Sequence, residues 1–207
     1  MKRLLSTILC AIIAISAFAQ SEATNQPLSE EENFEIKHLA FKGIPIDGTP
    51  SEFGQKLKSS GFTYSYEYDG IPWYKGSFAG YSGCEIAVKS SNNLVYEVVV
   101  IFPKDYSWGH LYTTYSSLKN MLVTKYGEPT SISEEFVNTP IYRDLTDDND
   151  KFYEVKDNHC KYYAGFSTAE DGLGLIQLEI KSSGCVGLHY MDLINSFSKE
   201  SAAINDL

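Results

Sequence analysis

The chain has 207 residues and a formal net charge of −10 at pH 7, from 27 acidic and 17 basic side chains. An acidic surface repels phosphate backbones and anionic lipid headgroups, so a role in nucleic-acid binding or in polybasic membrane binding is disfavoured. The length suits one domain of ordinary size, or two small repeats that share a core.

The first residues have the pattern of a secretory signal peptide. Lys2 and Arg3 form a short positive region, residues 4–18 are apolar, and Ala17-Phe18-Ala19 has the small-x-small pattern of a cleavage site. The apolar run is shorter than the roughly 20 residues that a transmembrane helix needs. We therefore expect residues 1–19 to be removed, leaving a periplasmic or secreted protein with no integral membrane segment and a formal charge of about −12.

Residues 20–35 are polar and acidic without periodicity, which predicts a disordered leader. We expect a single domain over residues 36–207. Its first helix is predicted from Pro50 to about Ser60, because Thr49-Pro50-Ser51-Glu52 forms a capping box with proline at the first helical position. A half-buried strand follows over residues 62–69, and its alternation predicts a core face of Phe62, Tyr64, Tyr66 and Tyr68.

Two short strands, residues 73–81 and 84–90, lead to the most apolar run of the chain, Leu94 to Pro103. Both faces of that run are largely apolar, which predicts a central strand that needs cover on both sides. The longest helix is expected between Ser107 and Gly127, because apolar residues recur there every three or four positions.

The second half is predicted to contain five strands and a surface insert. The strands are expected over residues 130–137, 152–156, 160–169, 173–183 and 186–191. Residues 139–151 are polar and acidic and are expected on the surface. A frayed helix is expected over residues 193–207.

A short internal similarity predicts two related halves. Phe78-Ala79-Gly80-Tyr81-Ser82 is followed in the second half by Tyr163-Ala164-Gly165-Phe166-Ser167, and each half begins with a helix ended by glycine. We expect two sub-repeats, about residues 36–103 and 104–191, each a helix followed by four strands. The predicted fold is α+β, with one broad antiparallel sheet, helices packed on one face and the other face partly open.

Two motifs carry a resemblance to known proteins. The residues 41–53, Phe-Lys-Gly-Ile-Pro-Ile-Asp-Gly-Thr-Pro-Ser-Glu-Phe, and the residues 122–129, Leu-Val-Thr-Lys-Tyr-Gly-Glu-Pro, are similar to those of uncharacterised secreted bacterial α+β domains. The predicted order of helices and strands also resembles the tandem helix-plus-sheet architecture of the β-lactamase inhibitor protein and of SmpA-type envelope domains. The resemblance implies a binding module and transfers no functional residue.

No motif specifies an enzyme, but four donor residues lie on neighbouring segments: His159, Cys160, Cys185 and His189. Together they suit zinc, although adjacent His159 and Cys160 point to opposite faces of a strand. They also suit a cysteine–histidine nucleophile pair, with Asp157 or Asn158 as the orienting group. Of the three cysteines that follow the signal peptide, Cys160 and Cys185 are the preferred disulfide partners, and three buried thiols are the alternative.

Two further clusters are candidate sites. The carboxylates of Asp144, Asp147, Asp148 and Asp150 are ligands that calcium accepts, but their spacing does not match an EF-hand loop, and a solvated loop is favoured. Aromatic residues gather near turns and strand ends, where they suit a platform for a sugar ring or a protein partner, or else the rim of a small core: Trp73, Tyr74, Tyr81, Tyr106 and Trp108.

The sequence thus favours a non-enzymatic binding module that acts through an open, aromatic-bearing sheet face, with a protein or glycan partner and no cofactor. A small envelope hydrolase with cysteine or histidine chemistry and a carbohydrate-binding accessory protein are the alternatives.

Overall fold

The structure is a computed structural model that describes residues 37–168 and 172–197. The expected signal peptide and acidic leader lie outside the described residues. The predicted C-terminal helix lies partly outside them, and its described part, residues 193–197, is helical.

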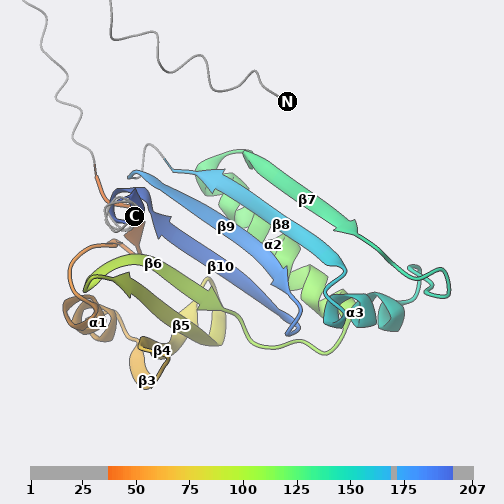
Figure 1. Ribbon diagram of the computed structural model, residues 1–207, viewed down its shortest axis with the longest axis horizontal. Coiled ribbons are helices and arrows are strands. Elements are labelled where there is room, and N and C mark those ends of the chain that lie inside the picture. Colours follow the sequence, from red (N-terminus) through yellow and green to blue (C-terminus); the bar gives the residue numbers. More distant parts are fainter. Residues whose placement is uncertain (1–36, 169–171, 198–207) are drawn as a thin grey trace, which may run out of the picture. The chain divides into compact units, whose positions relative to one another are not determined.

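One antiparallel sheet of eight strands dominates the fold (Figure 1). Its order is β3-β4-β5-β6-β10-β9-β8-β7. The strands of its first half are β3 (Thr63–Tyr68), β4 (Ile71–Phe78), β5 (Tyr81–Ser91) and β6 (Leu94–Ile101). Those of its second half are β7 (Ser131–Phe136), β8 (Cys160–Ser167), β9 (Gly174–Lys181) and β10 (Cys185–Asp192). The prediction that the apolar run beginning at Leu94 forms a central strand is confirmed, because β6 lies between β5 and β10.

The remaining elements are a small sheet and the helices. Strands β1 (Ala40–Phe41) and β2 (Ile44–Pro45) pair with each other. The helices are α1 (Pro50–Ser59), α2 (Trp108–Tyr126) and α3 (Asp148–Lys156), besides the helical residues 193–197. The capping box predicted for α1 is present, and Ser107 caps α2 by accepting a hydrogen bond from the backbone N–H of His110. Among the described residues, no helix combines the length and the hydropathy needed to span a membrane.

Helices α1 and α2 pack on the same face of the eight-stranded sheet. One register row on that face runs through Ala164, Leu178, Leu188, Val100 and Ile86, all buried. These residues form one core with the inward side chains of the two helices, which include Phe53, Leu57, Leu111, Tyr115 and Leu118. Figure 1 shows α2 behind β8, β9 and β10. The predicted packing of helices against one face of a broad antiparallel sheet is therefore present.

Helix α3 corrects the prediction of a strand over residues 152–156. Asp147 caps this helix by accepting hydrogen bonds from the backbone N–H groups of Asn149 and Asp150. Asp148 and Asp150 lie in its first turn, where negative charge complements the helix dipole. Phe152 and Val155, one turn apart, pack on the core. A short apolar segment was mistaken for a strand because its helical signal lies mainly in the preceding aspartates.

Strand β3 corrects the predicted core face of tyrosines. It is an edge strand, and the exposed fractions of Tyr64, Tyr66 and Tyr68 are 49%, 40% and 71%. A bulge between Tyr64 and Tyr66 breaks the strict alternation. Tyr64 therefore contacts Tyr74 on the helix-covered face, whereas Tyr66 stacks on Trp73 on the opposite face.

Candidate binding surface on the open face of the sheet

The second face of the sheet has no described helix packed on it. We call it the front surface and define it by the register row Tyr66, Trp73, Ala87, Val99, His189 and Gln177, with the flanking residues of the same face. In Figure 1 the strands lie in front of α2 and no described helix crosses before them. Exposed side chains on this surface include Tyr163 and Leu175, at 36% and 43% exposure.

A charged network occupies the centre of the front surface. His189 on β10 lies between two carboxylates from the neighbouring strands, with Nδ1 2.7 Å from Glu97 Oε1 and Nε2 3.1 Å from Glu179 Oε1. Lys89 pairs with Glu97 at 2.9 Å, and Lys181 pairs with Glu179. Because both ring nitrogens face carboxylates, only the imidazolium form donates hydrogen bonds to both.

The pKa values in the network favour the charged forms. Burial opposes charge on His189, but hydrogen bonds to Glu179 and Glu97 outweigh it and raise the pKa of His189 above 6.5. The hydrogen bond from His189 contributes most to lowering the pKa of Glu179 to about 2. Burial would raise the pKa of Glu97, yet its bonds to His189 and Lys89 hold that pKa below the usual range. The five side chains together carry one net positive charge when His189 is protonated.

Comparison of the chain with models of known protein families, with characterised proteins and with solved structures found no match. The site is therefore assessed from its own geometry.

The five aromatic residues predicted as a binding platform do not come together. Trp73 alone lies on the front surface, stacked on Tyr66 with ring centroids 5.7 Å apart. Tyr74 and Trp108 are buried on the helix-covered side, and Tyr81 packs on Phe102 there. Tyr106 is 77% exposed in the loop before α2, with the ammonium group of Lys104 over its ring.

The four residues considered as candidates for a zinc or nucleophile site are also separated. His189 belongs to the front-surface network, whereas His159 bonds to Glu154 beside α3 at 2.8 Å. Cys185 is buried next to the β9–β10 turn, and burial raises the pKa of the Cys160 thiol to about 12. The cysteines at positions 84, 160 and 185 are free thiols, and the preferred disulfide between Cys160 and Cys185 is not formed in the structure.

The acidic cluster has local structural roles. Asp147 caps α3, and Asp148 accepts a hydrogen bond of 3.0 Å from the backbone N–H of Gly109 at the start of α2. Asp144 bonds to Thr146, and Asp150 bonds to Arg143. Within the ranges that the structure describes, no group of three or more histidine, cysteine or acidic residues is arranged to hold a metal ion.

Sequence reasoning missed the network residues Lys89, Glu97, Glu179 and Lys181. Glu97 carried a usable signal, because it is the one charged residue in the apolar strand β6 and is only 4% exposed. A buried carboxylate in such a position requires compensating partners. The identity of those partners depends on the pairing of β6 with β10, which joins residues far apart in the chain.

Proposed function

We propose that the chain is an exported, non-enzymatic binding module whose front surface docks a protein partner. The observation that carries this proposal is the uneven cover of the sheet, with α1 and α2 on one face and no described helix on the other. An antiparallel sheet commonly leaves one face to solvent, so what favours binding is the set of exposed apolar and aromatic side chains on this face, which includes Tyr66, Tyr163 and Leu175.

The dimensions of the front surface suit a protein. Eight strands at the usual spacing span about 34 Å, and strands of eight residues extend about 26 Å. Their product is close to the roughly 800 Å² that each partner contributes to a protein interface of standard size. A surface of this extent is much larger than one sugar ring covers.

The distribution of side chains also favours a protein over a single sugar. The exposed aromatic residues of the front surface include Tyr66 and Tyr68 on β3 and Tyr163 on β8. Six strand spacings separate these strands, which is about 29 Å. Tyrosine and methionine are enriched in protein interfaces, and Met191 on the front surface is partly exposed. The central charges are already paired with one another, so a partner need not neutralise them.

The experiment is photocrosslinking from defined positions of the full chain in extracts of the cells that make it. A photoreactive amino acid replaces Gln177 on the front surface or, as the control, Met121, which is 51% exposed on α2. We expect one protein adduct of defined mass from position 177 only. Unlabelled protein should compete for it, and the Leu175→Glu substitution should abolish it.

Three outcomes would contradict the proposal. The first is an equal yield of the same adduct from positions 121 and 177. The second is an adduct that Leu175→Glu leaves unchanged. The third is the absence of a protein adduct, including the case in which only glycan is captured.

The order of elements supports a second proposal, that the two halves of the domain are copies of one unit. Each has a helix before four strands of the sheet, α1 before β3 to β6 and α2 before β7 to β10, and the two sets meet through β6 and β10. On this plan we also propose kinship with the tandem domains of the β-lactamase inhibitor protein and SmpA type. The sequence similarity lends no support, because residues 78–82 span the β4–β5 turn whereas residues 163–167 lie within β8.

A further inference from the structure

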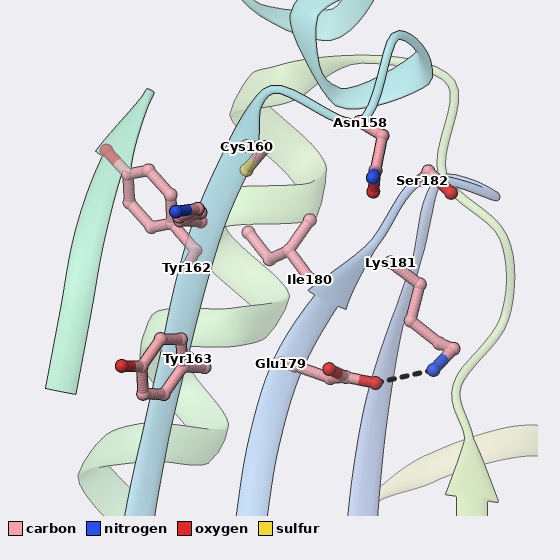
Figure 2. A pocket seen from close by; sticks show the side chains of 9 residues that line it. Asn158, Cys160, Tyr162, Tyr163, Glu179, Ile180, Lys181 and Ser182 are labelled. Atoms are coloured by element: carbon pink, nitrogen blue, oxygen red, sulfur yellow. Dashed lines mark hydrogen bonds and ion pairs between the residues drawn. The ribbon is translucent and has the colours of Figure 1, made fainter. Parts of the chain in front are cut away.

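A notch separates the ends of β8 and β9 at one margin of the front surface. The two strands pair only from Tyr163 opposite Glu179 to Ser167 opposite Leu175. Beyond that point residues 160–162 pair with β7 alone and residues 180–181 with β10 alone, so the strands diverge (Figure 2). The resulting cavity, which we call the β8–β9 notch, has a volume of about 270 Å³.

The rim of the notch is cationic. Lys161 and Lys181 both line it, as does the carboxylate of Glu179. Lys181 pairs with Glu179, which the hydrogen bond from His189 helps to keep ionised. Lys161 is exposed and makes no ion pair within the described residues, although Glu135 lies opposite it on β7. The three charges sum to one positive charge, in a chain whose net charge is −10.

The inner wall of the notch is apolar. Ile180 is 6% exposed, and Cys160 packs partly buried against the same core. Figure 2 shows both side chains between the two strands, with Tyr163 further along β8. Because burial raises the pKa of Cys160 to about 12, its thiol stays protonated at neutral pH and provides an apolar contact.

A cationic rim over an apolar wall selects a ligand with an anionic group and an apolar body. The volume is just below the range of about 300–1,000 Å³ that is usual for drug-sized ligands, so the ligand is small. We propose that the β8–β9 notch binds a small organic carboxylate. Lys161 contacts the carboxylate, and Ile180 and Cys160 contact the apolar part. This inference does not rest on the proposed protein partner, although the notch borders the front surface and shares Tyr163 with it.

Fluorine NMR of the full chain tests the site with 4-fluorobenzoate as the probe and 4-fluorobenzyl alcohol as its neutral counterpart. We expect the carboxylate to bind saturably and the alcohol to bind clearly more weakly. In proton–nitrogen NMR spectra of the protein, the carboxylate should shift only the amide signals of the notch. Lys161→Gln should weaken binding of the carboxylate about two- to fivefold, which is the upper part of the range for losing one exposed ion pair. Lys75→Gln is the control, because Lys75 is an exposed lysine of the same face on β4 and should have no effect.

The proposal is overturned if 4-fluorobenzoate does not bind, or if the alcohol binds equally well. It is also overturned if Lys161→Gln and Lys75→Gln have the same effect. Inorganic phosphate provides a further arm. Displacement of 4-fluorobenzoate by an equal concentration of phosphate would show a positively charged patch that binds any anion and has no site for the apolar part of a ligand. Failure of phosphate to displace 4-fluorobenzoate supports the proposed site.

Discussion

His189 shows how one side chain gains its properties from strands distant in the sequence. Its two ring nitrogens face Glu97 on β6 and Glu179 on β9. Neither pairing is visible from the residues around position 189, because both depend on strand register. The same dependence explains why the sequence offered His189 only as a disfavoured candidate for zinc or nucleophile chemistry, whereas the structure places the histidine in a network of ion pairs.

This network predicts a defined dependence of stability on pH. The pKa of His189 is raised, so its contribution is complete below about 6.5 and is lost as the pH rises through its folded pKa. The pKa values of Glu97 and Glu179 are lowered from 4.5. Their contribution is present above that value and is lost as the pH falls, for Glu179 through about 2. The network therefore stabilises the fold most between about pH 4.5 and 6.5.

Urea unfolding across the neutral range measures this effect. The native protein should lose more free energy of unfolding than the His189→Gln variant when the pH is raised from about 5.5 to about 8.5. His110→Gln is the control, because His110 is exposed at the start of α2 and should follow the native curve. An NMR titration midpoint for His189 below 6.5 would refute the interpretation.

At the scale of elements, α1 lies unusually close to the sheet at Gly54. A Cβ atom added at Gly54 would lie 1.9 Å from the hydroxyl oxygen of Tyr74, which is itself buried on β4. Helix propensity alone predicts that Gly54→Ala stabilises the protein by about 1 kcal/mol. We expect overpacking to outweigh this gain and the variant to lose about 1–2 kcal/mol of unfolding free energy.

A double-variant comparison separates packing from helix propensity. In a Tyr74→Phe background the hydroxyl is absent, so the loss caused by Gly54→Ala should shrink. Gln55→Ala, at the neighbouring exposed position of α1, should have little effect. Chemical denaturation of the four proteins of the cycle measures the coupling. If Gly54→Ala stabilises the protein, or if it lowers the free energy of unfolding equally with and without Tyr74→Phe, then α1 is not packed as closely as described.

Elements with local signals were predicted well, and those set by tertiary context were not. Helix α1 carries its capping box, α2 its apolar spacing and β6 its continuous apolar run, so each was found from its own residues. The short polar helix α3 lacks an apolar stripe and depends on aspartate caps. The faces of β3 were misassigned because a bulge cannot be read from alternating tyrosines.

At the scale of the whole molecule, the predicted plan of one broad antiparallel sheet with helices on one face is present, although it was inferred partly from the similarity between residues 78–82 and 163–167, which occupy different places in the strands. The composition of the front surface could not be predicted from the sequence, because it depends on which residues of β5, β6, β10 and β9 share a register row. The proposed function depends on that surface being accessible in the full chain, including the parts outside the described residues.

Accessibility of the front surface is measured most directly by solvent paramagnetic relaxation of the full chain with a soluble gadolinium complex. We predict strong relaxation of the Leu175 methyl groups and of the Gln177 side-chain amide, and weak relaxation of the Leu188 methyl groups, which are buried under the helices at 1% exposure. Protection of Leu175 and Gln177 equal to that of Leu188 would show that the chain covers its own front surface, and would contradict the account.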